Sequence, residues 1–114
     1  MDADAAVAVL DGFPVSEGHS RVIPKRHVEL RFELPEAELS LVWSVVAKVR
    51  RALKRKYQPD GFNIGVNEGK AAGQTIGHAH IHVIPRRAGD VPDPRGGIRW
   101  VLPAKARYWQ VEKA

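Results

Sequence analysis

The spacing of apolar residues predicts one long helix. Between residues 33 and 57 of the 114-residue chain, apolar side chains recur three or four positions apart, which places them on one side of an α-helix. Glu36 and Glu38 suit its N-terminal end, and Pro35 suits its first turn. We expect a helix over Glu33–Tyr57 that packs on the core through Leu39, Val42, Val46, Val49 and Leu53.

Four short segments have the composition of β-strands. They are rich in β-branched or alternating apolar residues, and the turn residues glycine, proline and aspartate border them. The predicted strands are Ala5–Leu10, Ser20–Ile23, Phe62–Val66 and His78–Ile84. The last two are joined by a loop rich in glycine and small polar residues, Asn67–Gly77, which suits a hairpin connection that binds a ligand.

The last predicted strand carries the most informative pattern. Three of the five histidines, His78, His80 and His82, alternate with apolar residues. Side chains alternate between the faces of a strand, so the three imidazoles are expected on one face and their apolar neighbours in the core. Histidine is the side chain that titrates near neutral pH, so this row indicates phosphate chemistry or metal binding.

Composition limits the setting. The length suits one domain, and an apolar content of 44% is enough for one core. The absence of cysteine excludes disulfides and thiolate–zinc sites. The acidic N-terminus lacks the features of a secretory signal, and no segment is long and apolar enough to cross a bilayer, so we expect a cytoplasmic protein without membrane partners.

The charge is a weak guide to partners. Lys and Arg outnumber Asp and Glu by 18 to 13, which favours anionic ligands. Much of this charge lies at the C-terminal end of the predicted helix, where cations complement the helix dipole. Nucleic acid is therefore not expected as a partner. After the histidines, Arg86–Pro103 is expected to form an irregular arm, and the bulky Trp100, Tyr108 and Trp109 should pack on other residues.

The histidines leave three chemical interpretations open. A metal could bind two alternating histidines, but three on one strand span about 13 Å at roughly 3.3 Å per residue, so a further ligand such as His19 or His27 would be needed. A purely structural row would crowd imidazoles of pKa near 6.5. Nucleotidyl transfer needs a neutral nucleophile flanked by donors. The middle residue, His80, suits this role, with His78 and His82 beside it and Gln74 and Thr75 as further donors.

The motifs around the histidines resemble those of the histidine triad (HIT) family. His78–Ile84 fits the pattern His-φ-His-φ-His-φ-φ, where φ is apolar. Gly73-Gln74-Thr75 before it and Pro85–Asp90 after it are similar to the family, as are the upstream segments Asp11–Val15 and Gly18–His27. The resemblance covers about residues 6–90. It is greatest to the nucleotide hydrolases related to the fragile-histidine-triad and diadenosine polyphosphate hydrolase proteins.

The resemblance implies an α+β fold, in which an antiparallel sheet of about five strands packs against one long helix in a homodimer. Residues 1–90 would form the domain core and residues 91–114 its C-terminal arm. The implied function is hydrolysis or transfer at the α-phosphate of a purine nucleotide derivative, through a covalent nucleotidyl-histidine. We expect neither a cofactor nor a metal. The alternatives are a non-catalytic dimeric purine-nucleotide sensor and a metal-dependent enzyme using His78 or His80 with His19.

The family's roles transfer to individual residues of this chain. His80 resembles the nucleophile and His82 the histidine that contacts the phosphate, while His78 and His19 resemble supporting histidines. The resemblance further implies nucleotide binding by Leu10, Asp11, Gly12, Asn67, Gly73, Gln74 and Thr75, with Asp11 at the ribose hydroxyls and Leu10 and Gly12 near the base. The leaving group and the choice between adenine and guanine stay open.

Overall fold

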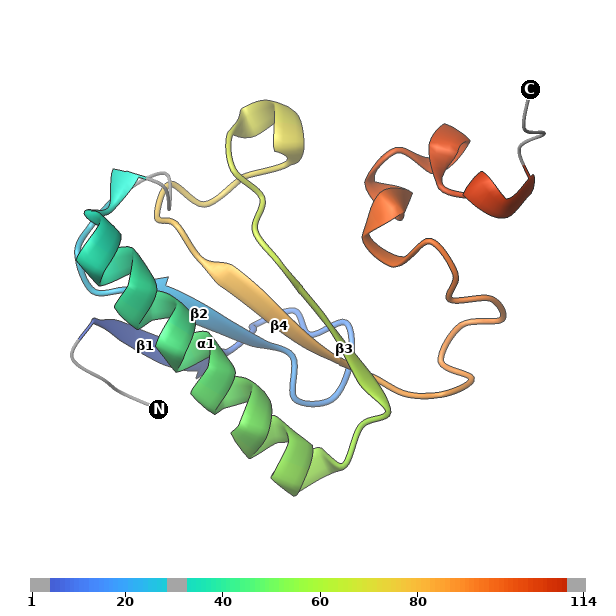
Figure 1. Cartoon of the computed structure of the whole chain (residues 1–114), viewed down its shortest axis with the longest axis horizontal. Helices are drawn as coiled ribbons and strands as arrows, with labels where there is room; N and C mark the ends of the chain where they lie inside the picture. Colours follow the sequence, from blue (N-terminus) through green and yellow to red (C-terminus); the bar gives the residue numbers. More distant parts are fainter. Residues whose placement is uncertain (1–4, 29–32, 111–114) are drawn as a thin grey trace.

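A computed structural model describes residues 5–28 and 33–110. Its strands are β1 (Ala6–Leu10), β2 (Ser20–Pro24), β3 (Gly61–Gly65) and β4 (Ile81–Arg86). They form one antiparallel sheet in the order β1-β2-β4-β3 (Figure 1). The α+β class is confirmed, but the described residues form four strands rather than about five. Apolar patterning indicates only these four, and the fifth came from the family resemblance alone.

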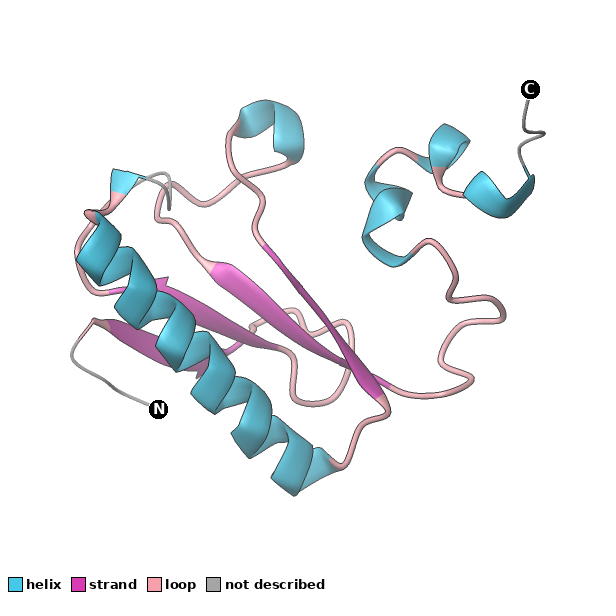
Figure 2. Cartoon of the chain, in the orientation of Figure 1, coloured by secondary structure: helices cyan, strands magenta, loops and turns pink. Residues whose placement is uncertain are grey.

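One long helix, α1 (Glu36–Tyr57), crosses one face of the sheet (Figures 1 and 2). The predicted apolar face is confirmed, because Val42, Val46, Val49 and Leu53 are buried. Leu39 lies at the margin of the core, and Val45 is buried as well. The helix begins three residues later than predicted. Pro35 stands just before its first turn, since its ψ of 148° is extended rather than helical.

The core lies between α1 and the inward side of the central strands. Val22 of β2 and both Ile81 and Val83 of β4 have no exposed surface. Alternation therefore turns Arg21 and His82 to the opposite, open side of the sheet. This open side carries the polar residues discussed below.

The predicted bounds of all four strands need correction. β1 begins at Ala6 rather than Ala5, β2 ends at Pro24 rather than Ile23, and β4 ends at Arg86 rather than Ile84. β4 begins at Ile81 rather than His78, because the preceding residues bond elsewhere: the Ala79 N–H donates to the Val28 carbonyl at 2.9 Å. The three histidines therefore do not form one continuous row on a strand. β3 runs over Gly61–Gly65 rather than 62–66, and its antiparallel pairing with β4 confirms the hairpin connection.

The chain after β4 leaves the sheet as an irregular arm beside β3 (Figure 1). The arm contains short 3₁₀ turns, as does the loop between β3 and β4. No helix in the described part of the chain is long and apolar enough to span a membrane. The turns are η2 (Lys70–Ala72) in the loop and η3 (Gly97–Val101), η4 (Pro103–Lys105) and η5 (Tyr108–Gln110) in the arm.

Candidate active site

His80 and His82 meet residues from three other parts of the chain in a pocket of about 220 Å³ on the open side of the sheet. The end of β1, the middle of β2, the loop between β3 and β4 and the start of β4 all reach this pocket. Strand pairing places Arg21 opposite His82 and His82 opposite Gly65. The lining residues are Asp11, Gly12, Phe13, Arg21, Asn67, Gly73, Gln74, Thr75, Ile76, His80 and His82.

The hydrogen bond of His80 leaves one of its ring nitrogens available. His80 Nδ1 lies 3.0 Å from the carbonyl oxygen of His78. A carbonyl can only accept, so Nδ1 carries the proton and Nε2 keeps its lone pair in the neutral ring. His80 is 9% exposed and lines the pocket, which places a nucleophilic nitrogen at a protected site.

A second chain of hydrogen bonds sets the protons on His19 and His82. The backbone N–H of Val15 donates to His19 Nδ1 at 3.2 Å, so His19 carries its proton on Nε2. His19 Nε2 lies 2.9 Å from His82 Nδ1, which therefore accepts. The proton of His82 is left on Nε2. His82, whose ring centroid is 4.9 Å from that of His80, thus presents an N–H donor near His80.

Burial keeps this pair of histidines neutral. It lowers the pKa of both His19 and His82 from the ordinary value of 6.5. The positive charge of Arg21 lowers both values further, whereas the negative charge of Asp11 raises them. At neutral pH both rings are therefore uncharged, as required by the two hydrogen bonds in which the Nδ1 of each ring accepts.

Asp11 is held in place at the end of β1. Its Oδ1 accepts the backbone N–H of Phe13 at 2.8 Å, and this bond lowers the pKa of the carboxyl. Its Oδ2 lies 3.5 Å from Arg21 Nε, 3.6 Å from His19 Nε2 and 3.8 Å from His82 Nδ1. An ionised carboxylate therefore stands at the centre of the polar cluster.

The loop between β3 and β4 forms another wall. Gln74 stabilises this loop, because its Oε1 accepts the Gly69 N–H at 2.8 Å and its Nε2 donates to the Ile76 carbonyl at 3.1 Å. Gly73 has a φ of 95°, which suits glycine. Thr75 and the exposed Asn67 also line the pocket, in agreement with the expectation from the sequence.

Three of the predicted site residues, His19, His78 and Leu10, are not among the residues that line this pocket. His78 Nε2 donates to the Pro24 carbonyl at 2.9 Å, and its ring packs edge-on against His27. His78 reaches the site only through its carbonyl, which orients His80. Leu10 is 66% exposed and is not among the lining residues. The structure brings the remaining predicted residues together in the pocket, and His19 adjoins them through its contacts with Asp11 and His82.

Sequence reasoning missed three lining residues, Arg21, Phe13 and Ile76. Phe13 is 92% exposed and lies in the predicted turn after β1. Arg21 stands inside a strand, and its place beside His82 depends on the pairing of β2 with β4. A single arginine in a predicted strand gives no signal of that partner. Alternation on β2 would have placed it only on the face opposite Val22.

A second, more apolar pocket of about 390 Å³ also borders His82. Ile64, Ile84 and the arm residues Ile98 and Val101 supply apolar walls. His82 and Asn67 line both pockets, so both offer room to a ligand bound at His82.

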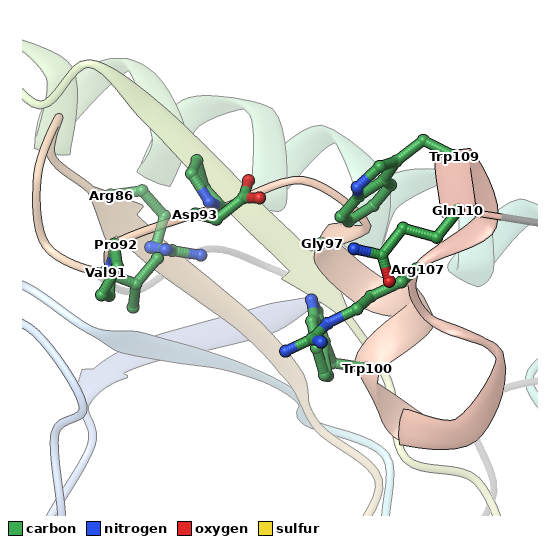
Figure 3. A pocket seen from close by; sticks show the side chains of 10 residues that line it. Arg86, Val91, Pro92, Asp93, Gly97, Trp100, Arg107, Trp109 and Gln110 are labelled. Atoms are coloured by element: carbon green, nitrogen blue, oxygen red, sulfur yellow. The ribbon is translucent and has the colours of Figure 1, made fainter.

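The arm forms a separate pocket of about 530 Å³ that contains no histidine (Figure 3). Its cations already have partners: Arg86 donates to the Asp90 carboxylate at 2.7 and 2.8 Å, and Arg107 lies 5.6 Å from the ring centroid of Trp100. Arg95 likewise lies 4.2 Å from the ring centroid of Trp109. Trp100 and Trp109 therefore pack on arginines of the arm, as predicted for these bulky side chains. His80 and His82 line a different pocket.

The polar cluster also resembles a metal site in its spacing. Potential ligand atoms of Asp11, His19 and His82 lie within 4.8 Å of one another. The hydrogen bonds oppose such a site, because His19 Nε2 carries a proton and a metal needs a lone pair there. The grouping also differs from the metal alternative derived from the sequence, which paired His19 with His78 or His80.

Comparisons with known proteins agree with this geometry. The sequence model of the HIT domain family matches residues 1–89 of this chain. An uncharacterized HIT-like protein of Saccharolobus solfataricus is 39% identical over 97% of this chain and 80% of its own length. The adenylylsulfatase HINT3 of Arabidopsis thaliana is 41% identical over 76% of this chain, which spans only 44% of that protein.

A solved structure gives the same result for the fold. The hypothetical histidine triad nucleotide-binding protein of Sulfolobus tokodaii superposes with a TM-score of 0.75 and 41% identity. The alignment covers 82% of this chain and 62% of that one. With the family model matching most of its length, the chain belongs to the histidine triad (HIT) family.

Proposed function

We propose that this protein hydrolyses or transfers nucleotidyl groups at the α-phosphate of purine nucleotide derivatives, with His80 as the nucleophile. Membership of the HIT family supports nucleotide hydrolase or transferase chemistry in general terms. The observation that carries the finer proposal is the hydrogen bond from His80 Nδ1 to the His78 carbonyl, which leaves Nε2 free in the pocket.

The proposed reaction has two displacements at phosphorus. His80 Nε2 attacks, a nitrogen–phosphorus bond forms, and the bond to the leaving group breaks with its electron pair. Water then attacks the same phosphorus and gives up a proton to solvent, and the electron pair of the nitrogen–phosphorus bond returns to Nε2 as the nucleoside monophosphate leaves. The His82 Nε2–H donates to a phosphate oxygen, which stabilises the charge that builds up in each step.

The remaining site residues position the nucleotide in this proposal. Asp11 accepts hydrogen bonds from the ribose hydroxyls, and Leu10 and Gly12 lie toward the base. Asn67, Gln74 and Thr75 lie beside the phosphates, and Gly73 gives their loop its shape. The two pockets that border His82 support a substrate with a group on each side of the reacting phosphorus.

A turnover screen tests this function. The panel contains an adenosine phosphoramidate, adenylyl sulfate, a lysyl-adenylate and adenine and guanine dinucleoside polyphosphates; adenylyl sulfate is included because one relative is an adenylylsulfatase. His80→Ala should abolish product formation while AMP still binds. His27→Ala, which removes a histidine outside the pocket, should keep wild-type turnover.

Two results of this screen would contradict the proposal. Wild-type turnover by His80→Ala would exclude His80 as the nucleophile. Micromolar binding of AMP or GMP by the wild-type protein without product from any substrate would favour the non-catalytic sensor instead.

We also propose a cytoplasmic homodimer, as the family resemblance implies. Exposed apolar side chains on the arm support a protein partner there: Ile98, Val101 and Leu102 are 65%, 73% and 68% exposed. A second copy of the chain is the occupant expected for this surface.

A further inference from the structure

Arg21 places a positive charge inside the pocket that contains His80. Strand pairing sets it in one row across the sheet, between Val9 of β1 and His82 of β4. The buried residues of β2 alternate with it, so its side chain lies on the open side with His82. That side chain is only 22% exposed and lines the pocket.

The guanidinium is incompletely satisfied by the protein. Its Nε is buried and has no hydrogen-bond partner among the described residues. The nearest anionic atom is Asp11 Oδ2, 3.5 Å away, and this oxygen is shared with His19 and His82. A buried donor without an acceptor is destabilising, so its presence in a pocket calls for an explanation.

Holding Asp11 in place does not provide that explanation. The Phe13 N–H already fixes Asp11 through Oδ1 at 2.8 Å. The pairing of β1 with β2 does not require a cation at position 21 either, because the residue opposite Arg21 on β1 is the apolar Val9. A ligand that brings an acceptor into the pocket would satisfy the guanidinium.

The ligand chemistry that fits is a phosphate oxygen. Arginine forms charge-assisted hydrogen bonds with phosphate, and its planar group presents several N–H donors to neighbouring oxygens. The same pocket holds the free Nε2 of His80 and the N–H of His82. We propose that Arg21 is a specificity-determining residue that binds a phosphate oxygen of the nucleotide; this inference rests on the proposed function.

Binding of AMP and adenosine to Arg21→Ala and Arg21→Lys tests the inference. Both ligands are measured by calorimetry on the full-length protein, so turnover does not interfere. Arg21→Ala should weaken AMP about tenfold to a hundredfold, the range for hydrogen bonds to charged groups, and leave adenosine within about twofold. Arg21→Lys should recover part of the loss, because it keeps the charge without the planar donors.

Arg26→Ala is the matched control. It removes one positive charge near the end of the same strand, but Arg26 is exposed and paired with Glu38 outside the pocket. It should leave the affinity for AMP unchanged. A loss of AMP affinity in both alanine variants would mean that net charge alone is responsible and would overturn the inference.

The other outcomes also separate the two proposals. Equal weakening of AMP and adenosine by Arg21→Ala, or no change in either affinity, would overturn the role of Arg21 and leave the proposed function standing. Absence of binding of both AMP and GMP by the wild-type protein would overturn the proposed function, and this inference with it.

Discussion

Reactivity at the site depends on which ring nitrogen of each histidine carries the proton. Backbone groups make that choice for two rings: the Val15 N–H for His19 and the His78 carbonyl for His80. The hydrogen bond from His19 Nε2 to His82 Nδ1 then determines that the proton of His82 is on Nε2. The result is one nitrogen that can attack and one N–H that can donate, side by side, before any substrate binds.

This arrangement predicts an acid limit to activity. Protonation of His82 at Nδ1 would place two donors against each other and break its hydrogen bond with His19, and protonation of His19 at Nδ1 would break its hydrogen bond with the Val15 N–H in the same way. Because burial lowers both pKa values below 6.5, kcat/KM should be constant around neutral pH and fall only at more acidic pH. A pH profile of kcat/KM from about 4.5 to about 8, which spans the ordinary pKa of histidine, checks the expectation.

Asp11→Asn should move that acid limit to lower pH. The Asp11 charge raises the pKa of both histidines, so its removal lowers both values. Asp93→Asn removes the same charge from the exposed part of the arm and should leave the limit where it is. An acid limit that moves to higher pH in Asp11→Asn, or that moves equally in both variants, would contradict the assignment to these histidines.

At this scale the sequence predicted the residues that line the pocket better than their surroundings. The spacing of His78, His80 and His82 indicated the middle residue, which does line the pocket. Arg21 could not be found in the same way, because its neighbour His82 is distant in sequence and strand pairing decides their contact. The turn of His78 toward Pro24 was likewise a tertiary contact without a local signal.

The elements hold the site through a close approach between the loop before β2 and the end of α1. Gly18 lies next to His19 and has a φ of 89°, which side chains other than glycine rarely adopt. A Cβ at this position would lie 2.8 Å from ring carbons of Tyr57. The glycine therefore permits both the turn and the packing that place His19.

Gly18→Ala should destabilise the fold and reduce activity together. The left-handed conformation costs about 1–2 kcal/mol for a residue with a Cβ, and displacement of Tyr57 adds to this. Gly89→Ala is the control, since Gly89 has a φ of 84° but nothing within 4 Å of a new Cβ. Urea unfolding of both variants should show a larger loss of unfolding free energy for Gly18→Ala; equal losses would mean that packing against Tyr57 is unimportant.

Local patterns predicted the elements well where periodicity was long. The helix was found from its repeating apolar face, and only its start was misplaced, by the backbone of Pro35. The strand of the histidines was harder, because alternation continues through residues 78–80 although their backbone bonds to another segment. Alternation of side chains is thus necessary for a strand but does not ensure pairing.

The whole molecule combines a compact helix-on-sheet core with an arm that extends beside β3 (Figure 1). Sequence reasoning predicted the arm to be irregular, and its 3₁₀ turns agree. It did not predict that Ile98 and Val101 would complete a pocket next to His82. Such contacts follow from the path of the whole chain rather than from any local pattern.

The exposed apolar surface of the arm predicts the assembly state. We expect a dimer in sedimentation velocity at low micromolar concentration, and Leu102→Asp should weaken it by placing a charge in the apolar interface. Leu41→Asp alters a similarly exposed leucine on α1 and should have no effect. A wild-type protein that sediments as a clean monomer would contradict this expectation.

Direct detection of the covalent intermediate tests the central claim. The protein is mixed with the substrate that turns over in the screen, quenched with denaturant at alkaline pH, and analysed by intact mass and peptide mapping. We predict the added mass of one nucleotidyl group on His80, and none in His80→Ala. A nucleotidyl group on another residue, or steady turnover with no adduct at any time of quenching, would contradict nucleophilic attack by His80.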